Sequence, residues 1–440
     1  MSIPSIRPVT STLLLVAILA CPITSLFADF DAETGWNGHL FPSYIIATAT
    51  MKDPDATSEM EDSDAGEDAD ATDSETETPN GDDDDSDDVD MSDSEYEILG
   101  DERGLLGITI EATEDAQEVT VTISCDEIME PSSITCTLSK SGETYTVNPK
   151  IKYKYEQLAR RTQTGPITVT YSVEVGENDA EEKFETLTLR SINDCPYGRS
   201  IDGTWTSTRF MFAAYVNEQH PFVDGVLREA LNSKIVNSFT GHQSKDKVEV
   251  YRQAYAIWYA LSQRDVRYSN VTQTVAASDT VGSQHIRLID ESIDNGQANC
   301  VDGSVLLASL LRKIDIEPIL VHVPGHCYLA FVLDEEGKEL TGIETTMIGS
   351  EIEGNAINVK GLENVIDQER QADNSWKTFC AAIARGTANL KKFEKEFSDP
   401  ENQRYKLISV AGARKSGILP IGFQSKRAFV AAPKKTDDEE

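Results

Sequence analysis

Hydrophobic and polar residues alternate with a period of two over residues 104–192, a pattern typical of half-buried β-strands. Glycine, proline, asparagine and aspartate separate the alternating stretches, as expected of turns between short strands. Short strands of this kind predict an all-β, sandwich-like domain over residues 104–195. The stretches are GLLGITIEA, EVTVTISCD, SSITCTLSK, ETYTVNPKIKYKY, PITVTYSVEV and KFETLTLRSI.

The hydrophobic pattern changes to a helical period in the following region. Apolar residues recur every three or four positions in two segments, and a mostly apolar helix is expected later, before three strands. Helices followed by an antiparallel sheet predict an α+β domain over residues 196–375. The expected elements are helix 220–235, helix 246–266 running into the strand-like VRYSNVTQTVA, helix 301–314, strand 318–323, strand 326–333 and a strand that ends at Glu344.

The flanking segments carry weaker patterns. Residues 376–440 predict one amphipathic helix at 376–396 and a tail, which is expected to fray beyond Ser409. Residues 29–50 contain WNGHLFPSYIIATAT and receive no assignment. Residues 29–50 could form either a single strand or a segment that docks onto another part of the protein.

Residues 1–28 resemble an export signal peptide. Arg7 precedes the apolar run LLLVAILA, and Ala28 is a small residue near a cleavage point. A cut before Cys21, which would give a lipoprotein, fits less well because Leu19 suits that signal poorly. The run is shorter than the roughly 20 residues of a transmembrane helix. We therefore expect an exported protein of the periplasm, cell surface or exterior, with no membrane span in the mature chain.

Acidic residues dominate the composition. The chain has 39 Lys and Arg against 76 Asp and Glu, a formal charge of −37, which argues against a nucleic-acid partner. Residues 51–100 hold 22 of the acidic residues and only one basic residue, Lys52. Low hydrophobicity and like-charge repulsion predict a disordered acidic linker over 51–103. Two roles stay open for this linker: it is a solvated spacer, or it loosely binds divalent cations.

Seven cysteines are present, and none forms a CxxC pair, so neither a zinc ribbon nor a thioredoxin-type motif is supported. Cys125 and Cys136 lie in adjacent predicted strands, where a disulfide or two buried thiols are both compatible with an exported protein. A disulfide between Cys300 and Cys327 is a further alternative. The remaining cysteines are Cys21, Cys195 and Cys380.

Three residues in the α+β region combine the side chains of a thiol-based catalytic triad. Cys300 begins the apolar helix, where free backbone N–H groups and the positive end of the helix dipole favour a thiolate and could hold an oxyanion. His326 starts a strand after a Pro-Gly turn, and Glu344 ends the strand that turns back beside it. The sequence therefore predicts Cys300 as nucleophile, His326 as base and Glu344 as its orienting carboxylate.

Other polar residues near this triad are candidates for supporting roles. Gln297 is a candidate donor to an oxyanion, and Gln284 and His285 are candidates to line the pocket or to be ordinary loop residues. His322 and His326 are four apart, but Pro324 and Gly325 exclude the helical spacing of a zinc pair. We predict no metal and no cofactor.

This order of elements and residues resembles the transglutaminase-like superfamily, a papain-related α+β fold with Cys at a helix start, then His, then an acid on successive elements. The resemblance covers residues 210–349 and includes YAIWYALSQRDVRYS before the cysteine. It implies that Cys300, His326 and Glu344 act as nucleophile, general acid–base and orienter. The sequence departs from the family in having Glu344 in place of the usual Asp and Cys327 where an aromatic residue is common.

The resulting functional hypothesis is an exported cysteine enzyme that cleaves or transfers amide bonds, peptide or isopeptide, through a thioester at Cys300. Its substrate would be a protein or peptide, and hydrolysis and transfer to an amine share one triad, so both stay open. The alternative is a catalytically inactive transglutaminase-like protein that binds partners or has a structural role in the cell envelope or exterior.

Overall fold

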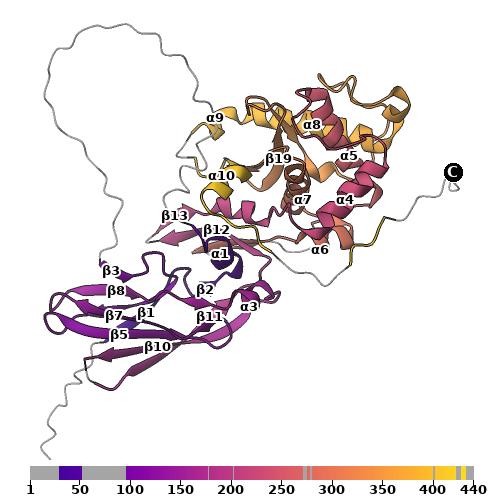
Figure 1. The fold of residues 1–440 in the computed structure, drawn as a ribbon. Helices are drawn as coiled ribbons and strands as arrows, with labels where there is room; N and C mark the ends of the chain where they lie inside the picture. The colour runs from indigo at the N-terminus through magenta and orange to yellow at the C-terminus, as the bar shows by residue number, and fades with distance from the viewer. Residues whose placement is uncertain are drawn as a thin grey trace, which may run out of the picture.

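Two bodies make up the computed structural model, one built mainly from strands and one rich in helices, which gives a mixed α+β protein (Figure 1). The predicted signal peptide and nearly all of the predicted acidic linker lie outside the described residues. No helix in the described parts of the chain has both the length and the apolar character needed to cross a membrane. The described residues are 29–51, 96–176, 178–201, 203–270, 275–277, 280–399, 402–422 and 428–432.

Two sheets form the first body, and their inner faces share one core that includes Ile108, Val121 and Val169. Each of the six alternating stretches contains a strand, because every second residue is apolar and faces this core. One sheet has the order β1 (Phe30–Thr34), β4 (Leu106–Glu111), β8 (Thr144–Asn148) and β3 (Glu97–Gly100). The other has the order β2 (His39–Leu40), β11 (Glu181–Leu189), β10 (Gly165–Val175), β5 (Gln117–Ser124) and β7 (Ser132–Leu138). Smaller elements are β6 (Met129–Glu130), β9 (Lys152–Tyr153) and α3 (Tyr155–Ala159).

The unassigned segment 29–50 belongs to both bodies. Its strand β1 pairs with β4 and its strand β2 pairs with β11. Its helix α1 (Pro42–Ala47) reaches the second body, where Ser43 Oγ donates to the carbonyl oxygen of Asp194 at 2.6 Å. The backbone N–H of Leu419 also donates to the carbonyl oxygen of Ala47. This segment therefore joins the two bodies.

The disulfide considered between Cys125 and Cys136 is absent, and both thiols are free. The register of β5 with β7 places Cys136 opposite Val119, six residues before Cys125. Six residues of strand span about 20 Å, whereas a disulfide requires Cα atoms within about 7 Å. The pairing register, which the alternating pattern does not reveal, keeps the two thiols apart.

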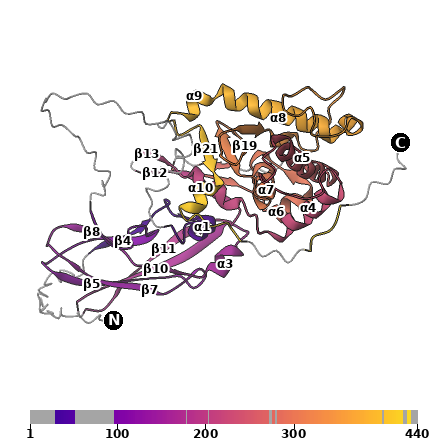
Figure 2. The same ribbon diagram turned by 45° about the horizontal axis from the view of Figure 1, so that its top comes forward.

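A buried helix and an antiparallel sheet form the centre of the second body. Helix α7 (Cys300–Lys313) packs against β18 (Pro318–Val323) and β19 (His326–Val332). The sheet order is β20, β19, β18, β21, with β20 at Leu340–Ile343 and β21 at Lys406–Ser409. Figure 2 shows α8 (Asn374–Lys392) running along one side of this body, with α5 (Lys247–Gln263) beside it. Further elements are η2 (Arg209–Tyr215), α4 (Pro221–Asn232), α6 (Ile289–Asn295), η3 (Thr345–Met347), η4 (Gln368–Ala372) and α9 (Glu394–Phe397).

Two small sheets lead up to α7. One has the order β13 (Thr204–Ser207), β12 (Asp194–Ile201), β16 (Val281–His285) and β15 (Val275–Ala277). The other pairs β14 (Arg267–Tyr268) in parallel with β17 (Gln297–Ala298), directly before Cys300. The stretch expected as a strand after the second helix contains β14 at its start and the first two residues of β15 at its end.

The prediction that the tail frays beyond Ser409 is wrong for the residues that follow it directly. Helix α10 (Val410–Lys415) comes immediately after β21, which pairs with β18. Val410, Ile418 and Ile421 are buried in the main core of the second body. Spaced apolar residues thus anchor this part of the tail, and residues 433–440 lie outside the described part.

Gly386 of α8 and Gly342 of β20 test how closely the helix and the strand are packed. A methyl group on Gly386 would lie 2.4 Å from the carbonyl carbon of Gly342, closer than packing allows. We expect Gly386→Ala to lower the free energy of unfolding by about 1–3 kcal/mol despite the better helix propensity of alanine. Chemical denaturation would measure the change.

Gly422→Ala is the control, because no atom of the described residues lies within 4 Å of the added methyl group. Equal stability of the two variants would contradict the close approach of α8 and β20.

Candidate active site

Asn299 and Asp302 fix the start of α7. Asn299 Oδ1 accepts from the backbone N–H groups of Val301 and Asp302 at 2.8 and 2.9 Å. In return, Asp302 Oδ2 accepts from the N–H of Asn299 at 2.9 Å. This reciprocal capping box satisfies orphan amides at both positions. It holds Cys300, which lies between the two capping residues, in one place.

Arg287 completes the support of this helix end. Its backbone N–H donates to Asp302 Oδ1 at 2.8 Å, and its Nη1 donates to Asp302 Oδ2 at 2.7 Å. Asp302 is fully buried, and burial raises the pKa of its carboxyl group while these hydrogen bonds lower it. The pair is structural, because it ties the chain before α6 to the first turn of α7.

His326 and Glu344 come together across the sheet as predicted. Gly325, with φ of +73°, occupies the turn between β18 and β19 and leads directly into His326. His326 Nε2 lies 2.9 Å from Glu344 Oε2. Glu344 follows β20, and its side chain is 1% exposed, whereas that of His326 is 30% exposed. The carboxylate therefore lies inside and the imidazole faces partly outward.

Two further contacts hold the Glu344 side chain and backbone. Glu344 Oε1 accepts from the backbone N–H of Thr346 at 3.3 Å and from Thr346 Oγ1 at 2.7 Å. Its own N–H donates to the carbonyl oxygen of Ala382 in α8 at 3.0 Å. Burial raises the pKa of the carboxyl group, but hydrogen bonds from His326 and Thr346 and the nearby imidazole charge bring it below its ordinary value. Glu344 is therefore ionised at neutral pH.

The Cys300 side chain is the other close neighbour of the His326 ring. Its interaction with the ring is the largest cause of the rise in the pKa of His326 to about 9, followed by the hydrogen bond to Glu344, while burial acts in the opposite direction. Nε2 is engaged by the carboxylate, which leaves Nδ1 free to interact with the thiol. The structure thus brings together all three residues predicted from the sequence as a triad, in the order thiol, imidazole, carboxylate.

The helix amides offer less to an oxyanion than the sequence suggests. Asn299 occupies the N–H groups of Val301 and Asp302 through its side chain and that of Gly303 through its carbonyl oxygen, at 3.0 Å. Within the described structure, the N–H of Cys300 is the one amide of this turn without an acceptor. The oxyanion site predicted along the first turn is therefore reduced to a single backbone donor.

Tyr268 is a neighbour of the thiol that the sequence reasoning missed. It lies opposite Ala298 in the parallel pair of β14 and β17, and it is 48% exposed. Burial, and then the charges of Cys300 and Glu344, raise its pKa, so its hydroxyl keeps its proton and can donate. The predicted donor Gln297 is exposed on β17, and no contact of its side chain with Cys300 is seen among the described residues.

A second thiol lies beneath the first. Cys327 is buried, and burial, with the charge of Cys300 as a smaller cause, raises its pKa well above the ordinary value. Ser304 interacts with the Cys327 thiol, which partly offsets the rise of its pKa, and donates to the carbonyl oxygen of Cys300 at 2.7 Å. Both cysteines are free thiols here.

The remaining candidate residues have other neighbours. His285 Nδ1 lies 3.3 Å from Asp194 Oδ1, so its carboxylate partner is on β12 rather than in the triad, and Gln284 of the same strand faces Cys195 of β12 in register. His322 is buried against the ring of Phe212, and burial lowers its pKa to about 3, which makes it neutral. Among the described residues, no three of His, Cys, Asp and Glu are grouped in a way that could hold a metal ion.

Some supporting residues had a sequence signal and others did not. Asn299 and Asp302 flank the cysteine with capping-box spacing, so the sequence indicates their role. Thr346 lies two residues after Glu344, close enough in sequence to be predicted as its partner. Arg385 of α8 lies 3.9 Å from Glu344 Oε2 and is 65% exposed, but no local pattern points to it. Its position depends on how α8 packs.

Comparisons with known proteins give no relative on which to base a function. No protein-family model matches this chain, and neither a curated protein nor a solved structure matches it. The functional argument therefore rests on the geometry of the site.

Replacing Glu344 tests the imidazole–carboxylate pair. We expect Glu344→Gln to lower the pKa of His326 from about 9 by about 1–2 units, because the imidazolium loses both a charge-assisted hydrogen bond and a neighbouring negative charge. An NMR titration of the histidine ring would measure it. Glu339→Gln, which removes a surface carboxylate paired with Lys247, is the control. An unchanged His326 pKa in the Glu344 variant would exclude the pair.

His326 also makes stability depend on pH. Its pKa of about 9 in the folded protein exceeds the ordinary value of about 6.5, so protonation favours the folded state. The stabilisation is fully present below about pH 6.5 and is lost as pH rises through 9. Urea titrations across this range should show the stability gap between wild type and His326→Gln shrinking with pH. A gap that grows with pH would contradict this sign.

Proposed function

We propose that this protein is a transglutaminase-like cysteine enzyme that acts on amide bonds through a thioester at Cys300. The observation that supports this best is the set of Cys300, His326 and Glu344, in which the imidazole is hydrogen-bonded to the carboxylate and interacts with the thiol. A thiol next to an imidazole that is itself oriented by a carboxylate is the arrangement that nucleophilic catalysis requires. The family resemblance of the sequence points to the same chemistry.

The first step forms the thioester. With its pKa near 9, His326 is protonated at neutral pH and faces the sulfur as an imidazolium. The Cys300 thiolate attacks the amide carbonyl carbon, and the N–H of Cys300, with the Tyr268 hydroxyl beside it, stabilises the oxyanion. His326 then gives its proton to the leaving nitrogen as the C–N bond breaks.

The second step releases the acyl group. His326, now neutral, takes a proton from water or from an amine as that nucleophile attacks the thioester carbon. The C–S bond breaks, and the proton returns the site to the ion-paired form. Glu344 stays ionised throughout and stabilises the imidazolium whenever it forms. Water as acceptor gives hydrolysis, and an amine gives transfer.

The exposure of the site favours a protein or peptide as substrate. Cys300 is half-buried, His326 is 30% exposed and Tyr268 is 48% exposed, so the reactive edge faces the surface. An extended chain or a side-chain amide on a large protein could approach such an edge. Export, proposed from the sequence of residues 1–28, would place that substrate outside the cytoplasm.

Alkylation of Cys300 tests the proposed function. We expect iodoacetamide to label Cys300 at pH 6, because the imidazolium of His326 stabilises the thiolate, and His326→Ala to slow labelling by about tenfold or more. Peptide mapping by mass spectrometry would follow Cys300 alone. Labelling that appears only above pH 8 and ignores His326 would overturn the nucleophile assignment.

His285→Ala is the matched control, since it removes another partly exposed imidazole paired with a carboxylate. It should leave the labelling of Cys300 unchanged. Hydrolysis of model amides, and incorporation of a fluorescent amine into a glutamine-containing protein, would separate the two acceptors, with Cys300→Ala as the inactive reference.

A further inference from the structure

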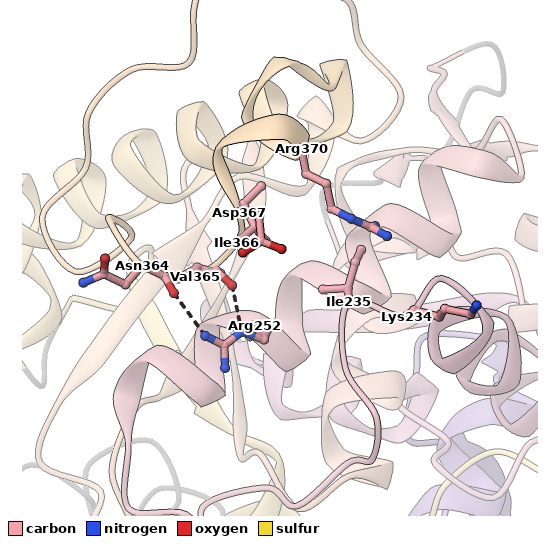
Figure 3. A pocket seen from close by; sticks show the side chains of 8 residues that line it. All are labelled: Lys234, Ile235, Arg252, Asn364, Val365, Ile366, Asp367 and Arg370. Carbon is pink, nitrogen blue, oxygen red and sulfur yellow. Dashed lines mark hydrogen bonds between the residues drawn. The ribbon is translucent and has the colours of Figure 1, made fainter.

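A pocket of about 350 Å³ lies on the helical body at the N-terminal half of α5 (Figure 3). Its walls come from the turn after α4, from α5, from the segment 364–367 and from η4. Such a volume is at the lower end of the range for small-molecule sites. The lining residues are Lys234, Ile235, Arg252, Asn364, Val365, Ile366, Asp367 and Arg370.

This pocket is separate from the triad. Arg252, which lines it, lies near the start of α5, whereas Tyr268 and the triad lie beyond the end of that helix. A helix rises about 1.5 Å per residue, so Arg252 and the end of α5 at Gln263 are about 16 Å apart along the axis. A ligand in the pocket would not contact Cys300.

Arg252 shapes the pocket rather than offering itself to a ligand. Its Nε donates to the carbonyl oxygen of Val365 at 2.7 Å, and its Nη2 donates to that of Asn364 at 3.0 Å (Figure 3). Its Nη1 pairs with Glu249. These bonds use the guanidinium to tie the segment 364–365 to α5, which gives the pocket a fixed wall.

Two cations remain for a ligand. Arg370 Nη2 donates to the carbonyl oxygen of Ser233 at 3.0 Å, which orients the guanidinium. Neither Arg370 nor Lys234 has a carboxylate within 4 Å in the described parts of the chain. Lys234 has a φ of +59°, a backbone conformation that lysine rarely adopts, so the fold holds it in an unfavourable state at the rim. Within the described residues both cations therefore lack an ion-pair partner, although the charge of Arg370 acts on Asp373 nearby.

The other lining groups define the rest of the ligand. Asp367 carries the one carboxylate of the lining, and Ile235 and Ile366 supply apolar surface. Figure 3 shows Ile366, Asp367 and Ile235 between the two arginines, with Lys234 beyond Ile235. Cations, an anion and an apolar patch around a small volume complement a molecule that carries a carboxylate, an ammonium group and an aliphatic side chain.

We propose that this pocket binds a free aliphatic amino acid. Its carboxylate pairs with Arg370 and Lys234, its ammonium group pairs with Asp367, and its side chain lies on Ile235 and Ile366. Arginine forms bidentate bonds with carboxylates, and such charge-assisted bonds are the stronger class. The proposal stands on the pocket alone. If the protein hydrolyses peptide bonds, the ligand belongs to the class of its products.

Calorimetric titration of the full chain with L-leucine tests this site. We expect saturable binding of one leucine per chain. Leucinamide, which lacks the carboxylate, and 4-methylpentanoate, which lacks the ammonium group, should each bind about tenfold more weakly. Inorganic phosphate should not displace leucine. Equal binding of leucine and 4-methylpentanoate, or displacement by phosphate, would overturn the amino-acid assignment in favour of a general anion site.

Variants locate the binding. Lys234→Gln and Asp367→Asn should each weaken leucine binding about tenfold, and both positions are exposed, so the fold should tolerate the changes. Lys245→Gln is the matched control, because Lys245 also has a positive φ but pairs with Glu335 outside the pocket. Absence of leucine binding to the folded wild type, or binding unaffected by both pocket variants, would refute the site. Cys300→Ala should bind leucine normally, so failure of the proposed enzymatic function would not be mistaken for failure of this site.

Discussion

A carboxylate almost completely removed from water sets the condition that the surrounding structure must meet. Burying an ionised carboxylate without partners costs several kcal/mol, so Glu344 requires its hydrogen bonds to be in place. His326 binds one of its oxygens and Thr346 binds the other. The backbone of Glu344 is in turn held by Ala382 of α8. The packing of α8 against β20 is therefore coupled to the orientation of the imidazole.

The same principle governs the thiol at the other side of the site. Helix α7 is buried along nearly its whole length, and Cys300 lies at its half-buried N-terminal end. Buried Asp302, neutralised by Arg287 and capped by Asn299, determines where that end begins. The buried carboxylates of Glu344 and Asp302 thus fix the positions of the His326 imidazole and the Cys300 thiol, which remain accessible. Reactivity at the surface depends on charges that the solvent does not reach.

Much of this arrangement was readable from the sequence, and the reason is periodicity. Helices α4, α5 and α7 and strands β18 and β19 bury one face or both, so apolar spacing marked them within a few residues. The triad was readable because each member lies at the beginning or end of such an element. Elements as short as β2 leave no periodic signal, and β21 was missed in the same way because four residues are too few to show one.

Other features depended on information that spacing does not contain. The separation of Cys125 from Cys136 follows from the register of two strands. The alternating pattern shows that each strand exists, but it does not show which residues of the two strands lie opposite one another. The reduced oxyanion site follows from competition between Asn299 and a ligand for the same amides. Tyr268 is near the thiol because β14 pairs in parallel with β17. These are properties of pairing and packing rather than of local sequence.

The way the N-terminal segment is attached has a consequence for a cleaved form of the protein. Strands β1 and β2 and helix α1 come before residues 52–95, and every strand they pair with comes after. Ala47 and Thr50 also accept from and donate to the backbone at Leu419 and Gly417. A peptide bond broken between residues 52 and 95 would therefore yield two polypeptides that stay associated through sheet hydrogen bonds and a shared core. Such a nicked protein would migrate as two bands in denaturing gels and as one particle in solution.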